Sequence, residues 1–186
     1  VDFNRYNGFF HKLQVLEFLS LIASGAGAIG IHKAIFCNGA NMAYRKEIFI
    51  EVNGFKDDTI VSGDDVFLLH NIKAKYPQSI AFAKDRDAIV TTNSPITVKE
   101  FVNQRKRWAA KSSAYQDSSS VYASYLVLLT NVSFVVLLGM LFFDSSLFFY
   151  FLIFYVSKFS VDLFLLYPVL NFFNRKELIK WIFPFE

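Results

Sequence analysis

Residues 123–143 read ASYLVLLTNVSFVVLLGMLFF and contain no charged side chain. A helix of about 20 apolar residues crosses the hydrocarbon core of a bilayer, which is roughly 30 Å thick. In lipid such a helix satisfies its own backbone hydrogen bonds. Asp144-Ser145-Ser146 interrupts the run, and a second apolar stretch covers residues 147–170. The sequence therefore predicts two transmembrane helices that form a hairpin.

The composition fits a polar region joined to this hairpin. The chain has 186 residues, of which 54% are hydrophobic and 19% charged, and more than half of its 23 Phe follow residue 122. The single Cys37 excludes an internal disulfide framework, and the apolar content excludes a disordered tail. A net charge of +3 is too small to indicate nucleic-acid binding, so we expect no nucleic-acid partner.

Cations flank the hairpin on both sides. They are Arg105, Lys106, Arg107 and Lys111 before the first run and Arg175, Lys176 and Lys180 after the second. Because positive flanks stay in the cytoplasm, we predict a cytoplasmic domain over residues 1–118 and a membrane region over residues 119–186. The chain begins with Val, without a signal peptide, and ends in a further apolar stretch. We therefore expect a piece of a longer protein.

The second run contains two charges, Lys158 and Asp162, spaced four apart on one helical face. One interpretation is a self-neutralising pair that faces a protein neighbour. The alternative is a functional intramembrane ion pair, which would make the protein a membrane transport or channel component.

The polar region alternates between helical and strand-like patterns. These patterns predict helices over residues 9–23, 45–52 and 64–75, a helix that opens at a Thr97–Glu100 capping box, and strands over residues 31–37, 80–83 and 88–92. Such alternation indicates an α/β layer. Gly25-Ala-Gly27-Ala-Ile-Gly30 matches the dinucleotide-binding fingerprint, which needs a strand before it and a helix after it. Here the preceding segment is helical, so we interpret it as a close-packed turn.

Two further patterns carry chemistry. Asp64 and Asp65 follow Ser62-Gly63 at the start of a helix, where they either cap the helix or offer a carboxylate as proton acceptor. Gly-Asp-Asp also occurs in RNA polymerases, but the spacing after Asp65 is helical rather than that of a hairpin. The stretch from Gln104 to Trp108, QRKRW, is either a membrane-interface anchor or a phosphate clamp with an aromatic platform for a sugar.

The stretch from Cys37 to Asn41, CNGAN, places small residues between two amides. It is either a turn capped by Asn or a loop that approaches a ligand closely. A nucleophilic Cys37 would need a His partner that the sequence does not identify.

The order of these motifs resembles a known family. Asn38-Gly39-Ala40-Asn41 with Arg45-Lys46 and Asn53-Gly54-Phe55, then Gly63-Asp64-Asp65, then Gln104-x-x-Arg107-Trp108 before membrane spans is similar to the C-terminal half of a membrane-bound family 2 glycosyltransferase. The branch resembled is that of cellulose, chitin and hyaluronan synthases, and the resemblance covers roughly residues 1–170. It implies part of a GT-A, Rossmann-like domain followed by the hairpin, and a role in polysaccharide biosynthesis at the bacterial inner membrane.

The resemblance also implies roles for individual residues. Asp65 would be the catalytic base of an inverting transfer from a nucleotide sugar, with UDP as the expected nucleotide, and Asp64 would be the acidic residue before it. Gln104 and Arg107 would hold the diphosphate, and Trp108 would lie under the acceptor sugar. The loop of Cys37, Asn38, Gly39 and Asn41 would line the acceptor side, where a glycan or lipid-linked hydroxyl binds.

The chain departs from this family in one respect. The nucleotide-binding half with its Asp-x-Asp metal motif is missing, and no Asp-x-Asp occurs between residues 1 and 186. The resemblance implies Mg²⁺ or Mn²⁺ in the full enzyme, with its main ligands outside this chain and no metal site within it. We therefore expect the 186 residues alone to be inactive and to need the missing N-terminal half as a partner.

Overall fold

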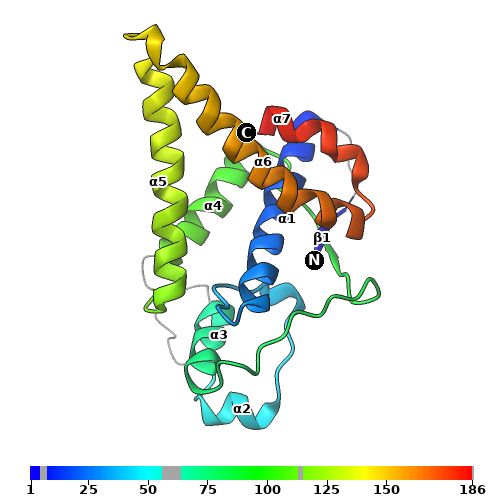
Figure 1. Ribbon diagram of the computed structural model, residues 1–186. Coiled ribbons are helices and arrows are strands. Elements are labelled where there is room, and N and C mark those ends of the chain that lie inside the picture. The colour runs from blue at the N-terminus through cyan, green and yellow to red at the C-terminus, as the bar shows by residue number, and fades with distance from the viewer. Residues whose placement is uncertain (5–7, 56–63, 113–114, 186) are drawn as a thin grey trace.

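The computed structural model describes residues 1–4, 8–55, 64–112 and 115–185, and side chains are described in these ranges except at residues 111 and 112. Figure 1 shows a mostly helical molecule. Its elements are β1 (Asp2–Phe3), α1 (Phe9–Gly30), η1 (Gly39–Asn41), α2 (Lys46–Glu51), α3 (Asp64–Lys75), β2 (Thr91–Thr92), α4 (Val98–Ser112), α5 (Ser118–Met140), η2 (Ser145–Leu147), α6 (Phe148–Phe172), η3 (Lys176–Trp181) and α7 (Ile182–Phe185).

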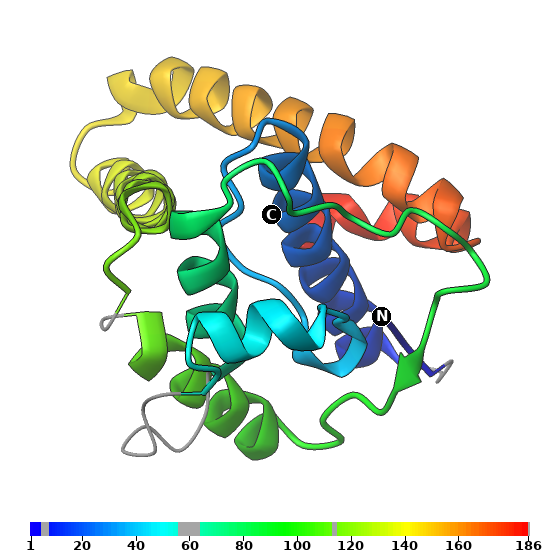
Figure 2. The same ribbon diagram turned by 90° about the horizontal axis from the view of Figure 1, so that it is seen from below.

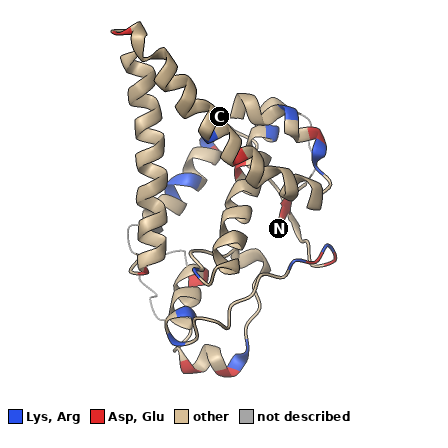
Figure 3. Cartoon of the chain, viewed as in Figure 1, with Lys and Arg blue, Asp and Glu red and all other residues tan. Residues whose placement is uncertain are grey.

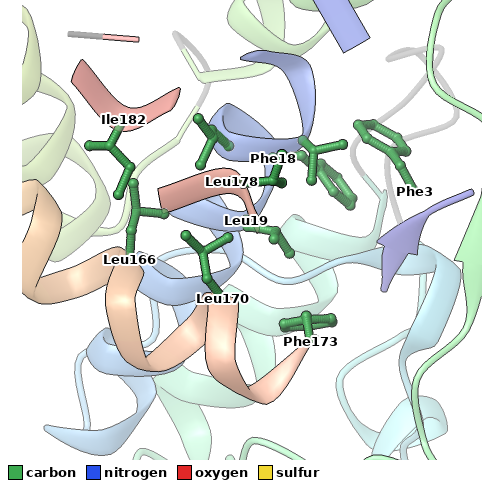
Figure 4. Packing of buried hydrophobic residues seen from close by; sticks show 10 residues of the cluster. Phe3, Phe18, Leu19, Leu166, Leu170, Phe173, Leu178 and Ile182 are labelled. Atoms are coloured by element: carbon green, nitrogen blue, oxygen red, sulfur yellow. The ribbon is translucent and has the colours of Figure 1, made fainter. Parts of the chain in front are cut away.

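One hydrophobic core joins the two ends of the chain. The labelled side chains of Figure 4 come from β1, α1, the last turns of α6, η3 and α7, together with Phe173 directly after α6. The fully buried members include Leu16 and Leu19 of α1, Leu166 and Leu170 of α6, and Ile182. Burying each such side chain contributes about 1.5–3 kcal/mol. The second half of the predicted span 147–170 therefore contributes to this core.

A buried ion pair fastens the chain start to the end of α6. Arg175 donates from Nε and from one terminal nitrogen to Oδ2 of Asp2, at 3.0 and 2.9 Å, and also to the carbonyl oxygen of Phe3. Both side chains are nearly fully buried. A buried charge is tolerated only with such partners, so this pair fixes β1 against the core.

The predicted hairpin is present as α5 and α6. Phe134 of α5 packs its ring 5.3 Å from that of Phe151 of α6. Asp144 ends the turn by accepting a hydrogen bond from the backbone of Ser146 at 2.9 Å. Figure 3 shows no Lys, Arg, Asp or Glu along α5 between its ends, and most of its large apolar side chains are exposed. Both helices are long and apolar enough to cross a membrane.

A third helix, α1, also meets this length and composition requirement. The sequence predicted a helix only over residues 9–23 and a turn over residues 25–30, and that turn is wrong because the helix continues to Gly30. The reason is packing: a Cβ on Gly25 would lie 2.9 Å from the Phe36 ring, so Gly25 allows close approach inside a helix. In Figure 2, α1 passes through the middle of the molecule, between α6, η3 and α7 on one side and α3 and α4 on the other.

The predicted strands are largely wrong. Within the described ranges the only strands are β1 and β2, which pair in parallel with Asp2 opposite Thr91 and Phe3 opposite Thr92. Residues 31–37 and 80–83 form no strand. The α/β layer and the Rossmann-like core are therefore not seen in this part of the molecule.

Residues 33–38 are nevertheless held in place, by side chains instead of a neighbouring strand. The carbonyl oxygen of Ala34 accepts from Lys73 at 2.8 Å. The carbonyl oxygen of Ile35 lies 2.9 Å from His70 Nε2 and accepts from the Ser120 hydroxyl at 2.9 Å. Buried carbonyl groups need hydrogen-bond partners. Side chains of α3 and of the start of α5 supply them here, in place of the backbone N–H groups of a neighbouring strand.

The short helices of the polar region agree well with their predictions. Helix α2 lies within the predicted range 45–52 and ends before Asn53, whose φ of 57° is in the left-handed region. Helix α3 has the predicted bounds. Helix α4 begins with the predicted capping box, in which Glu100 N–H donates to Thr97 Oγ1 at 3.2 Å and Thr97 N–H donates to Glu100 Oε2 at 3.3 Å.

Candidate functional site

Asp65 lies at the start of α3 and faces Gly39, the first residue of η1. Its Oδ2 accepts a hydrogen bond from the backbone N–H of Gly39 at 2.9 Å, and its Oδ1 accepts from Val66 N–H at 2.9 Å. The side chain is half-buried, whereas Asp64 beside it is exposed. The carboxylate therefore has a fixed orientation and keeps partial access to solvent. Ser62 and Gly63, which the sequence placed in the preceding turn, lie outside the described residues.

The loop over residues 37–41 keeps its shape through its own polar groups. Asn38 Oδ1 accepts from Ala40 N–H at 3.1 Å, and Asn41 Nδ2 donates to the carbonyl oxygen of Ala88 at 2.7 Å. The Asn-capped turn anticipated from the sequence is thus present. The same loop reaches Asp65 through Gly39 and through the Cys37 thiol, which donates to the backbone oxygen of Asp65 over 3.4 Å.

Cys37 is poorly suited to act as a nucleophile. Burial and the nearby charge of Asp65 raise the pKa of its thiol to about 12, so the reactive thiolate is scarce near neutral pH. Burial and the same carboxylate also raise the pKa of Tyr115 to about 12. The surroundings of Asp65 therefore hold neutral hydroxyl and thiol groups.

Helix α4 presents one face to a surface pocket of about 340 Å³. The pocket is lined by Asn93, Ser94, Pro95, Glu100, Asn103, Gln104 and Arg107. The α4 residues among them recur at helical spacing on one face. Glu100 is the acid of this lining, and its Oε2 is engaged by the N–H groups of Ile96 and Thr97. The exposed Arg107 gives the pocket a cation suited to an anionic ligand, beside the negative charge of Glu100.

The other face of α4 packs toward α1. Phe101 lies edge-on to Phe10 of α1 at 5.7 Å, and Arg105 forms an ion pair with Glu17 of α1. The guanidinium of Arg105 also lies 4.1 Å from the centre of the half-buried Trp108 ring. The Trp108 ring packs against the main core rather than along the pocket.

The structure thus arranges the predicted site residues in two groups. Asp65, Cys37, Asn38, Gly39 and Asn41 share the α3–loop region, and Asp64 adjoins it. Gln104 and Arg107 share the pocket on α4, whereas Trp108, one turn after Gln104, packs against the core and is not part of the pocket lining. That both groups act on one substrate stays a prediction.

A polar cluster of His70, Lys73, Asp117 and Ser120 was not predicted from the sequence. Lys73 forms an ion pair of 2.7 Å with Asp117, which caps α5 by accepting from Ser120 N–H at 2.9 Å. Ser120 Oγ lies 3.0 Å from His70 Nε2. The signal available in the sequence was Asp117 placed before the apolar run, a typical helix cap. It predicts the cap but not the partners on α3.

The surroundings of Asp117 and His70 lower the pKa of both groups. Burial opposes ionisation of Asp117, but hydrogen bonds from Lys73 and Ser120 outweigh it and lower the pKa of the carboxyl. Burial lowers the pKa of His70, against the opposing effects of its hydrogen bond to Ile35 and of the Asp117 charge. Asp117 is therefore ionised and His70 neutral at pH 7.

Two other predicted features can be placed. Lys158 and Asp162 pair with each other, with 2.8 Å between Nζ and Oδ2, which both interpretations of these charges allow. Within the described parts of the chain, no three His, Cys, Asp or Glu side chains gather closely enough to hold a metal ion.

Comparison with known proteins assigns the family. No curated protein and no solved structure shows significant similarity to the chain. The family model described as glycosyl transferase family group 2 matches residues 1–173, which include α3, the pocket on α4 and the whole helical hairpin. The chain therefore belongs to glycosyl transferase family group 2, and its family relationship supports glycosyl transfer as its reaction.

Proposed function

We propose that this chain is the acceptor-binding and base-bearing part of an inverting membrane glycosyltransferase. Its reaction would move a sugar from a nucleotide sugar, with UDP as the nucleotide, to a hydroxyl of a glycan or lipid-linked acceptor. The observation that carries the proposal is the fixed carboxylate of Asp65, which accepts a hydrogen bond from Gly39 N–H in the loop facing it.

Asp65 is proposed as the general base. In an inverting transfer the acceptor hydroxyl attacks the anomeric carbon, the bond from that carbon to the diphosphate breaks, and the hydroxyl proton passes to the carboxylate. Positioned proton acceptors of this kind accelerate reactions typically 10²–10⁴-fold. The two hydrogen bonds to Asp65 support this role because they aim the carboxylate without neutralising it with a cation.

Gln104 and Arg107 are proposed to hold the diphosphate. Negative charge grows on this group as the glycosidic bond breaks, and donors placed beforehand stabilise it. Both residues line the pocket, and the carboxylate of Glu100 there is engaged by backbone N–H groups. A diphosphate in this pocket would meet Arg107 and amide donors.

The acceptor is proposed to lie between Asp65 and α4. The loop of Cys37, Asn38, Gly39 and Asn41 would line its side. Trp108 would have to expose part of its ring for the sugar to stack, since Arg105 covers one face at 4.1 Å. The proposal therefore includes a local shift of this side chain on substrate binding.

The proposed setting is the cytoplasmic face of a bacterial inner membrane, within a polysaccharide synthase of the cellulose, chitin and hyaluronan type. The three long apolar helices are consistent with a membrane protein. We propose that residues from the rest of such an enzyme bind the nucleotide and a Mg²⁺ or Mn²⁺ ion. Among the described residues no three His, Cys, Asp or Glu side chains gather to hold such an ion, and no step assigned to Asp65 or Arg107 uses it.

Replacing Asp65 in the full-length natural protein in membranes tests the proposal. Asp65→Asn keeps the size of the side chain but removes the base and leaves an NH2 group facing one of the two backbone N–H donors. We therefore expect sugar transfer to fall at least a hundredfold with donor binding retained. The exposed Asp64→Asn is the matched control and should lose less. If Lys158→Met and Asp162→Asn abolish function while Asp65→Asn does not, the protein acts in transport instead.

A further inference from the structure

We infer that Arg105, held by Glu17 of α1, positions the Gln104 side chain so that its amide donors serve the diphosphate pocket. Arg105 is one of the two residues between Gln104 and Arg107, and the proposed function gives it no role. The inference rests on the proposed function, since it concerns the same pocket. Arg105 acts here as a positioning residue that need not touch the substrate.

The side chain of Arg105 lies between Glu17 of α1 and two residues of α4, Gln104 and Trp108. One terminal nitrogen pairs with Glu17, and the other donates to Gln104 Oε1 at 2.8 Å. Its guanidinium carbon lies 4.5 Å from the centre of the Phe101 ring and 4.1 Å from that of Trp108. A flat group held by an ion pair and stacked on two rings has little freedom to rotate.

These contacts decide which end of the Gln104 amide faces the pocket. A guanidinium only donates hydrogen bonds, so the Gln104 atom facing it must be the carbonyl oxygen. The amide nitrogen, with two N–H donors, is then the end that Gln104 can offer to a pocket ligand. If the amide turned round, it would present an oxygen to phosphate oxygens and repel them. Arg105 thereby makes Gln104 a donor beside Arg107.

Glu17 holds the Arg105 side chain against α1 through their ion pair. It is a half-buried acid in α1, and its carboxylate fixes Arg105 against the helix that crosses the middle of the molecule. Loss of the Glu17 charge would free the guanidinium to turn toward solvent, and Gln104 would lose its partner without any change inside the pocket. Contacts of both α1 and α4 therefore determine which end of the Gln104 amide faces the pocket.

Binding of UDP compared with binding of uridine tests the inference on the full-length natural protein in detergent. The variants are Arg105→Gln and Glu17→Gln, and the control is Lys106→Gln, which removes an exposed cation from the next position of α4. We expect the first two to weaken UDP roughly tenfold, the size of a lost hydrogen bond to a charged group. Uridine, which has no phosphate, should bind as before, and Lys106→Gln should change neither affinity.

The conservative variant adds a second readout. Arg105→Lys keeps the charge near Glu17 but cannot pair with Glu17 and Gln104 through one planar fork, so it should recover only part of the UDP affinity. The donor KM should rise more than kcat falls in each variant, because the amide acts on the diphosphate in the bound state as well as during transfer. Equal weakening of UDP and uridine by Arg105→Gln would indicate a merely structural role and overturn the inference.

Arg107→Gln separates the inference from the proposed function. If this variant leaves UDP binding unchanged, the pocket does not hold a diphosphate, and both the function proposed for it and the role of Arg105 fail. If Arg107→Gln weakens UDP but Arg105→Gln and Glu17→Gln behave like Lys106→Gln, only the positioning role fails.

Discussion

Asp65 and Gly39 meet across two segments of the chain, with 2.9 Å between Oδ2 and the Gly39 nitrogen. A Cβ built on Gly39 would lie 2.7 Å from the same Oδ2 atom. The loop can therefore reach the carboxylate only because position 39 has no side chain. Gly39 is required here for space, since its backbone does not lie in the left-handed region.

Gly39→Ala should displace the carboxylate. The added methyl group would push Asp65 away from the hydrogen bond that orients it, and a base moved by as little as about 1 Å loses up to 10²-fold in rate. We expect sugar transfer by the full-length protein to fall at least tenfold, measured as kcat with saturating donor. Gly27→Ala is the control, because a Cβ there meets nothing within 4 Å and Ala favours the helix by about 0.5–1 kcal/mol. Wild-type transfer by Gly39→Ala would show that the orientation of Asp65 is unimportant.

Lys73 and Asp117 should stabilise the fold as a coupled pair. They join α3 to the N-terminus of α5, with only 11% and 15% of their side chains exposed. Lys73→Met and Asp117→Asn should each lower the free energy of unfolding, and a double-mutant cycle should give a coupling of about 1 kcal/mol. Chemical unfolding of the detergent-solubilised protein measures both quantities.

The pair of Lys75 and Glu51 provides the comparison. It has the same charges, but 47% and 39% of the side chains are exposed, so solvent screens the attraction. The corresponding cycle with Lys75→Met and Glu51→Gln should show no measurable coupling. Equal coupling in the two cycles would mean that burial at Asp117 contributes nothing.

His70 should make the stability depend on pH. Burial lowers its pKa below the ordinary value of 6.5, so folding favours the neutral ring. Its stabilising effect is complete above pH 6.5 and is lost as the pH falls toward the folded-state pKa, because the unfolded chain then binds more protons. His70→Gln, which keeps a donor for the Ile35 carbonyl, should flatten the fall in unfolding temperature between pH 7.5 and 5.5. His32→Asn is the control, since His32 is exposed and has a φ of 56° that Asn tolerates. An unchanged pH profile in His70→Gln would exclude His70 as its source.

The sequence predicted the helices of this molecule better than its strands. Apolar runs and caps are local, so Thr97 with Glu100 and the Asp144 turn could be recognised from neighbouring residues. A strand depends on a partner far along the chain, and residues 31–37 have the composition of a strand without that partner. Their carbonyls are bound instead by Lys73, His70 and Ser120, which no local pattern indicates.

Helix α1 and the site show the same contrast between local patterns, which the sequence reveals, and contacts between distant residues, which it does not. The small residues after Ala23 indicated a turn, because the contact of Gly25 with Phe36 cannot be read from spacing. The helix is consequently long enough to be a third candidate span. At the site, the motifs singled out Asp65 and Gln104, but the ion pair between Arg105 of α4 and Glu17 of α1 joins residues 88 positions apart. Local motifs therefore indicate candidate residues, whose roles stay predictions, whereas tertiary contacts could not be predicted from the sequence.

The hairpin of α5 and α6 should cross the bilayer and return. A tag inserted in the exposed turn at Asp85 and another inserted between Ser145 and Ser146 at the hairpin tip should be reached by protease from opposite sides of sealed membranes. Leu128→Lys places a charge at the middle of α5, where insertion costs about 2.5–3.5 kcal/mol more, and should return the tip tag to the side of the Asp85 tag. Ser146→Lys, at the tip, adds the same charge outside the apolar run and should leave the arrangement unchanged. If both tags of the unmutated protein are cut from one side, α5 does not span the membrane, and its exposed apolar surface must be covered by protein instead.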